Sequence, residues 1–160
     1  MGYLNFKNQT VEDIFRRFKW TRNNTLEILE TAKLHNILNH TIENASEFEL
    51  KPISFQFQCI ATTTDAYKRK LLNASDKSFG VLINGDKITL KEKIPVEILT
   101  QVLKDQIQEI EEIYKDADLE NIIELIKIID HEHMHHGELI LMLRVNNVDL
   151  PERFIKSWNL

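Results

Sequence analysis

The sequence predicts an all-α protein built as a four-helix bundle, and three observations support this. Apolar residues recur at helical spacing in four long stretches, near residues 11–34, 54–72, 95–114 and 118–145. Only four glycines and three prolines interrupt the 160 residues, which favours long helices over many short strands. A chain of this length is large enough to bury a core of its own. We therefore expect residues 1–160 to form a single domain of four packed helices.

The first predicted helix runs from about Val11 to Leu34. Thr10, with Asp13 three residues later, suits a capping box at its start. The apolar stripe of this helix consists of Val11, Ile14, Phe15, Phe18, Leu26 and Leu29. We expect the basic side chains elsewhere on the cylinder, namely Arg16, Arg17, Lys19 and Arg22. Residues 35–51 are polar and predict a loop that holds a short helical turn.

The second predicted helix begins near Ser54, after Pro52, and ends near Leu72. Helical spacing gives it an inward stripe of Gln56, Cys59, Ile60, Thr63, Tyr67 and Leu71. This stripe carries polar groups in the middle, where an ordinary core helix is aliphatic. Such groups are either satisfied locally or line a pocket.

Residues 79–91 change to the alternating pattern of strands. Two short apolar runs flank Asn84-Gly85, which is typical of a tight β-hairpin turn. The alternative is a long loop that covers one end of the bundle. A third helix then follows Pro95 and continues to about Tyr114. A fourth begins near a cap at Asp118 and ends near Val145, and the tail with Phe154 and Trp158 folds back or packs on a partner.

Composition excludes several classes of protein. The net charge of −5 has the wrong sign for nucleic-acid binding. No apolar run approaches the roughly 20 residues of a membrane span, and no signal-peptide pattern is present, so we expect a cytoplasmic protein that contacts neither nucleic acid nor membrane. The single cysteine, Cys59, excludes an intramolecular disulfide. It is a core thiol, a reactive thiol or a metal ligand.

A cluster of histidines lies inside the apolar pattern of the fourth helix. Residues 130–139 read Asp-His-Glu-His-Met-His-His-Gly-Glu-Leu and hold four of the six histidines. His131 and His135 are four residues apart, so both rings can face one metal ion, which zinc, nickel and iron(II) all accept. His133 and His136 form a competing pair on an apolar stripe. Spacing alone does not choose between the pairs.

In these motifs the chain resembles the DinB/YfiT-like family of four-helix bundles, whose divalent metal is held by three histidines. The family's last helix carries His-x-x-x-His followed by Arg-Gly-Gln-Leu, then Leu-Arg and a later proline. Here His131 and His135 match the ligands, His136 stands in the arginine position, Gly137 matches, and Glu138 stands in the glutamine position. The segment continues as Leu143-Arg144 and Pro151, and the resemblance extends from Ser54 to Pro151.

The resemblance departs from the family at the remaining ligand. Cys59, in Cys-Ile-Ala-Thr-Thr-Thr-Asp-Ala-Tyr, occupies the position of the histidine in the family's second helix. A thiolate binds zinc well, so the resemblance implies a metal site of Cys59, His131 and His135, with zinc, nickel or iron as the ion. If Cys59 is not a ligand, His40 or Asp65 are candidates for the third position. Gly137 is expected to let a neighbouring helix approach closely.

Characterised members of this family include metal-dependent thiol S-transferases and isomerases. The resemblance therefore implies an enzyme that activates a low-molecular-weight thiol towards a small electrophile, or a hydrolase working from the same site. Glu132, Glu138 or Asp130 would orient a ligand's second ring nitrogen. Relatives often form homodimers through helix faces, and the first and third helices carry apolar positions that permit one.

The alternative is a degenerate, non-catalytic bundle that acts as a binding or stress-response protein. In that hypothesis His131 and His135 are satisfied by polar neighbours such as Gln58 and Thr62, and no metal binds. Metal storage or sensing is a third hypothesis, which predicts a metal with no open coordination position.

Overall fold

The structure is a computed structural model, and it describes residues 6–42, 51–76 and 78–158. Four long helices form a bundle: α1 (Gln9–Leu34), α2 (Ile53–Leu71), α3 (Val96–Tyr114) and α4 (Ile122–Val145). The short elements are β1 (Val81–Ile83), β2 (Asp86–Ile88), the 3-10 turn η1 (Leu119–Asn121) and α5 (Glu152–Trp158). The prediction of an all-α four-helix bundle with a small hairpin is confirmed. The loop predicted for residues 35–51 lies partly outside the described residues.

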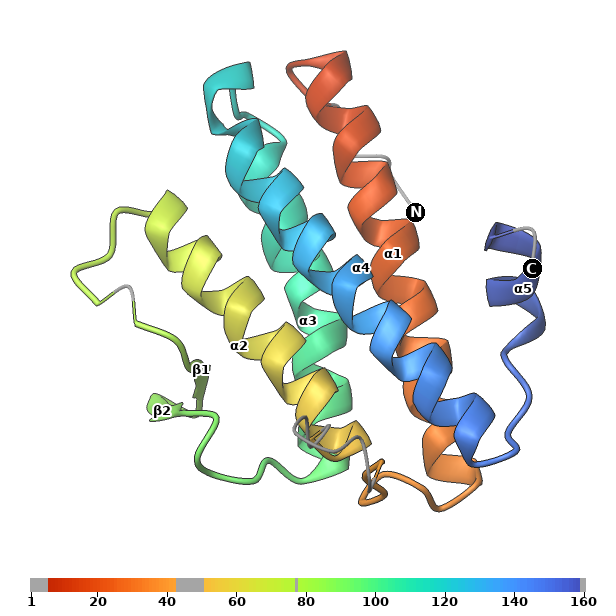
Figure 1. The fold of residues 1–160 in the computed structure, drawn as a ribbon. Coiled ribbons are helices and arrows are strands. Elements are labelled where there is room, and N and C mark those ends of the chain that lie inside the picture. The colour runs from red at the N-terminus through yellow and green to blue at the C-terminus, as the bar shows by residue number, and fades with distance from the viewer. Residues whose placement is uncertain (1–5, 43–50, 77, 159–160) are drawn as a thin grey trace.

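The helices are arranged so that α1 and α2 are diagonal to each other. Helix α4 packs against both α1 and α2, and α3 packs against the same two helices from the other side. Figure 1 shows α2 and α3 running in one direction and α1 and α4 in the other. Because α2 and α3 are parallel, the chain between them must return along the bundle, and it carries the β-hairpin on the way.

The hairpin forms where the alternating pattern predicted it. Val81 pairs with Ile88 and Ile83 with Asp86, around a turn in which Asn84 and Gly85 have φ of 52° and 89°. Two positive φ angles are what a tight hairpin turn requires, and Asn-Gly accommodates them at low cost. Arg69 of α2 donates to the carbonyl of Gly80 at 3.0 Å, and Val81 is buried. The hairpin therefore packs against α2.

One predicted helix cap is wrong. Helix α1 is capped by Asn8, whose side chain accepts from the backbone N–H groups of Thr10 at 2.9 Å and Val11 at 3.3 Å. Asparagine is among the best N-cap residues, and it comes early enough to include Gln9 in the helix. The fourth helix is likewise preceded by a turn of 3-10 helix after Asp118, instead of starting directly at that residue.

The core consists of two apolar clusters. One, near the start of α1 and the end of α3, includes Phe15, Phe18, Ile110, Tyr114 and Leu125. The other lies at the opposite end of the bundle and includes Leu29, Phe57, Leu103, Leu139 and Phe154. Between them lie buried polar residues contributed by all four long helices: Arg22, Thr25, Thr64, Gln106 and Glu132.

Of the two arrangements expected for the C-terminal segment, the structure shows it folded back on the bundle. Helix α5 places Phe154 against the ring of His136 at 5.5 Å between centroids, and Trp158 against the ring of His133 at 5.4 Å. Trp158 also lies 6.3 Å from Trp20 of α1. Helix α5 therefore packs beside α1 and α4. No helix in the described part of the chain is both long and apolar enough to cross a membrane.

Candidate metal centre

The antiparallel contact between α2 and α4 brings the three predicted ligands together. Nε2 of His131 lies 3.3 Å from Nε2 of His135 and 3.7 Å from Sγ of Cys59. One donor atom from each of the three residues lies within 4.8 Å of the others. Among the described residues this is the one such group of histidine, cysteine and carboxylate side chains. Residues 72 positions apart in the sequence thus meet as the resemblance implied.

The spacing of these atoms fits a tetrahedral metal. With ligand distances of about 2.0–2.1 Å to nitrogen and 2.3 Å to sulfur, a tetrahedral ion separates two nitrogens by about 3.3 Å and nitrogen from sulfur by about 3.6 Å. The two observed separations, 3.3 and 3.7 Å, match these values closely. The residues therefore fit zinc, or another divalent metal that accepts imidazole and thiolate.

His135 is held in the orientation that a ligand needs. Its Nδ1 donates to Oε1 of Gln56 at 2.7 Å and to Oε2 of Glu138 at 2.8 Å. Because both partners are acceptors, Nδ1 carries the proton and the lone pair on Nε2 points at His131 and Cys59. Of the three acids considered from the sequence as orienting groups, the structure selects Glu138. Gln56, which the sequence placed only on the inward stripe, is its buried companion.

Burial sets the protonation of the other two candidate ligands. It lowers the pKa of His131 to about 4, helped by the neighbouring His135. Burial also raises the pKa of the Cys59 thiol, opposed by a hydrogen bond from Thr63 and reinforced by Glu138. At neutral pH His131 is therefore neutral, with a free lone pair. A cation is needed to hold Cys59 as thiolate.

The competing histidine pair has other partners. Nε2 of His133 lies 3.0 Å from the hydroxyl of Thr21, and Nε2 of His136 lies 2.7 Å from the hydroxyl of Thr25. Both rings face α1 and α5 and not α2. Helix geometry thus sends the two pairs to different sides of α4, and His131 and His135 are the pair that faces a third ligand.

The side chains proposed to satisfy the ligand histidines without metal lie elsewhere. Gln58 donates to the carbonyl of Thr89 and accepts from the backbone N–H of Ile94, so it fastens the loop before α3. Thr62 donates to carbonyls of its own helix. Gln58 and Thr62 therefore do not satisfy the histidines as that hypothesis expected; the polar side chains that contact them are Gln56, Glu138 and Thr63. The two alternative candidates for the third ligand have partners elsewhere. His40 contacts Asn146, and Asp65 pairs with Lys68 and Arg69.

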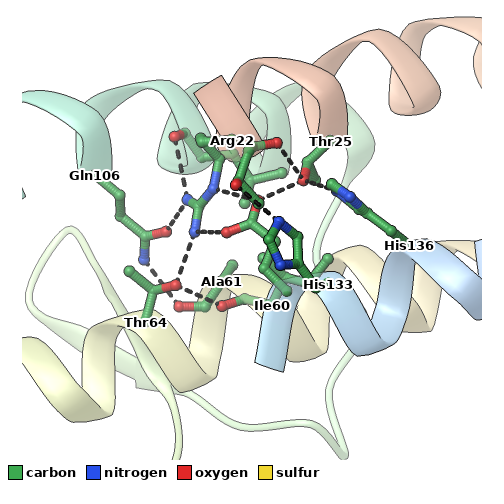
Figure 2. A network of polar contacts seen from close by, with 11 residues as sticks. Arg22, Thr25, Ile60, Ala61, Thr64, Gln106, His133 and His136 are labelled. Carbon is green, nitrogen blue, oxygen red and sulfur yellow. Dashed lines mark hydrogen bonds and ion pairs between the residues drawn. The ribbon is translucent and has the colours of Figure 1, made fainter. Parts of the chain in front are cut away.

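A buried ion pair next to the centre was missed by the sequence analysis. Arg22, expected among the surface basic residues, is fully buried and bonds both carboxylate oxygens of Glu132, at 2.9 and 3.0 Å. Its guanidinium also donates to Gln106 of α3 at 2.7 Å and to Thr64 of α2 at 2.8 Å (Figure 2). One side chain therefore ties α1 to the other three long helices, at the level of His131. The signal was present: Arg22 falls on the apolar stripe, between Phe18 and Leu29.

The Glu132 carboxylate is also bonded by the hydroxyl of Thr25, which contacts His136 (Figure 2). Arg22 and these hydrogen bonds hold the pKa of Glu132 below its usual value although burial alone would raise it. Glu132 therefore serves the buried ion pair, and it is not available to orient a metal ligand.

Comparisons with known proteins give no match: no family model matches the chain, and no curated protein or solved structure shows significant similarity. The resemblance to the DinB/YfiT-like family thus stays a prediction.

Proposed function

We propose that this protein is a divalent-metal-dependent enzyme of the thiol S-transferase or hydrolase type, with the metal held by Cys59, His131 and His135. One observation carries the proposal: three donor atoms from two helices lie within 4.8 Å of one another, two of their separations fit a tetrahedral ion, and His135 is oriented through Nδ1. The motif resemblance to DinB/YfiT-like proteins supports the same assignment. We also propose that the protein acts in the cytoplasm, as the sequence led us to expect.

Three protein ligands leave a fourth position of a tetrahedral ion free, which is the arrangement of catalytic zinc sites. A metal bound there would lower the pKa of a thiol or water enough to give a nucleophile at neutral pH. The chain's own groups would position that nucleophile. Thr63 places its hydroxyl 3.4 Å from Nε2 of His131, and Glu138 stands beside His135 with a third of its side chain exposed.

These features favour a small electrophile and a low-molecular-weight thiol as substrates, or water in the hydrolytic version. The acidic character of the chain, with a net charge of −5, speaks against a nucleic-acid substrate.

Metal content by mass spectrometry tests the proposal. Wild type purified without chelator should carry close to one divalent ion per chain, and Cys59→Ala, His131→Ala and His135→Ala should each lose it. His133→Ala is the matched control, because this ring lies on the same helix but contacts Thr21 instead of the centre. It should keep the metal.

Each other result has a definite meaning. Metal retained in Cys59→Ala would remove Cys59 from the ligand set. Substoichiometric metal in wild type, with no rise in Tm on adding zinc or nickel, would contradict the enzyme proposal and favour the non-catalytic bundle. If metal is confirmed, thiols are screened against electrophiles with the metal-free variants as blanks.

A further inference from the structure

The three consecutive threonines of α2 turn their hydroxyls to different partners. Thr62 and Thr64 each donate to a carbonyl of their own helix, at 3.0 and 2.9 Å, as threonine in a helix commonly does. Thr63 makes no such bond among the described residues. Its hydroxyl instead donates to the sulfur of Cys59 and lies 3.4 Å from Nε2 of His131, and its side chain is buried. Thr63 is therefore the one threonine of the three that faces the centre.

Metal binding would leave the sulfur of Cys59 as the acceptor for this hydroxyl. The metal would use the lone pair on Nε2 of His131, and an imidazole nitrogen has only that one. A thiolate sulfur has further lone pairs when it binds a metal, so it still accepts a hydrogen bond. Thr63 thus serves Cys59 as the acceptors at Nδ1 serve His135: it fixes the ligand and modifies its basicity.

A cysteine ligand is at risk in a centre that processes electrophiles. The thiolate is the nucleophilic form of cysteine, and Cys59 is only half-buried. An electrophile at the centre would therefore meet two sulfurs, that of the cosubstrate and that of Cys59. Attack by Cys59 would form a stable thioether and remove a metal ligand. A histidine ligand does not carry this risk, because its ligating nitrogen has no lone pair left.

We propose that Thr63 protects Cys59 from the electrophile by hydrogen bonding its thiolate and keeping it a weak nucleophile. The nucleophilicity of a thiolate falls with its basicity, and a donated hydrogen bond lowers that basicity. The cosubstrate thiol then reacts in preference to the ligand, although both sulfurs lie at one centre. Thr63 is a positioning residue in this inference, which rests on the proposed thiol S-transferase.

Iodoacetamide, a small electrophile, measures the nucleophilicity of Cys59 directly. The sulfur displaces iodide and gains a carbamidomethyl group, and because Cys59 is the single cysteine, the mass of the intact protein reports its alkylation. One hydrogen bond lowers the basicity of a thiolate by about ten- to a hundredfold, and nucleophilicity follows basicity with a Brønsted slope of about 0.4–0.5. Thr63→Val, assayed in excess zinc, should therefore be alkylated about three- to tenfold faster than wild type. In the cobalt-loaded variant the sulfur-to-cobalt charge-transfer band should move to lower energy.

Matched variants separate the effect of the hydroxyl from that of packing. Thr63→Ala also lacks the hydroxyl and should react as fast as Thr63→Val, whereas Thr63→Ser keeps the hydroxyl and should react at the wild-type rate. Thr62→Val removes a neighbouring hydroxyl that bonds only its own helix, and it should also match wild type. Cys59→Ala is the blank for alkylation elsewhere on the chain.

The possible failures are distinguishable. Wild type that binds neither zinc nor cobalt would contradict the proposed function, and this inference with it. If wild type binds metal, three results would overturn this inference alone and leave the proposed function standing. These are equal alkylation rates in Thr63→Val and wild type, no recovery in Thr63→Ser, or an equal acceleration in Thr62→Val.

Discussion

Replacing Arg22 by methionine tests whether the buried ion pair stabilises the bundle as its geometry implies. Both Arg22 and Glu132 have fully buried side chains, and the guanidinium bonds both oxygens of the carboxylate. Methionine fills much of the same volume but leaves Glu132 buried with only the hydroxyl of Thr25 as a described hydrogen-bond donor. Removing one partner of such a pair typically costs about 3–5 kcal/mol. A domain is usually stable by about 5–15 kcal/mol, so the loss should be large.

The double variant Arg22→Met/Glu132→Leu separates the ion pair from simple packing. With both charges gone, no uncompensated charge remains, and an apolar pair of similar volume is often as stable as the ion pair it replaces. We therefore expect the double variant to unfold at a higher urea concentration than Arg22→Met alone. The remaining cost comes from Gln106 and Thr64, which lose the guanidinium as a donor.

The assay is urea unfolding at neutral pH followed by circular dichroism, with all four chains of the mutant cycle measured in parallel. Arg16→Met is the control, since Arg16 pairs with Glu12 on the surface and should lose no more than about 0.5 kcal/mol. A loss below about 1 kcal/mol in Arg22→Met, or additive losses in the double variant, would refute the assigned role of the pair.

Burial lowers the pKa of His136 to about 4, so the unfolded chain binds more protons between pH 6.5 and 4. The free energy of unfolding therefore falls by up to about 3 kcal/mol as the pH falls through that window. In His136→Gln the free energy of unfolding should depend less steeply on pH over the same range. Gln56→Leu removes one acceptor from Nδ1 of His135 and should weaken zinc affinity about 10- to 100-fold in chelator competition, whereas Gln101→Leu on α3 should not. Phe154→Ala empties a fully buried position under α5 and should cost about 3 kcal/mol in thermal unfolding, against a smaller loss for Trp158→Ala, whose side chain is 40 % exposed.

The parts of the fold that could be predicted are those encoded by local pattern. Helical periodicity located the four long helices to within a few residues, and Asn84-Gly85 located the hairpin, because both signals depend on neighbours in sequence. The convergence of Cys59 with His131 and His135 was also predicted. The two histidines are four residues apart and must share a helix face, and the family resemblance indicated Cys59 as the third ligand.

The polar contacts between helices could not be predicted in the same way. Arg22 was expected on the surface, because a charged side chain ordinarily is, and its partner lies 110 residues away. Nothing local marks Glu132 as that partner. Gln58 was likewise assigned to the histidines, but it instead binds the loop before α3. The pairing of buried polar groups depends on how neighbouring helices are rotated and shifted along one another. The periodicity of a single helix carries no information about either.

The joining of four helices through Arg22 has a consequence for the order of folding. Helices α1, α2 and α3 could begin to pack on one another, but the guanidinium would then be removed from water with no carboxylate to neutralise it. Its counter-charge arrives only with α4. Partly assembled intermediates without α4 are therefore raised in free energy, which favours a cooperative, two-state transition. Fragments that end before Glu132 should fail to fold stably, because the charge at the centre of their core would have no counterpart.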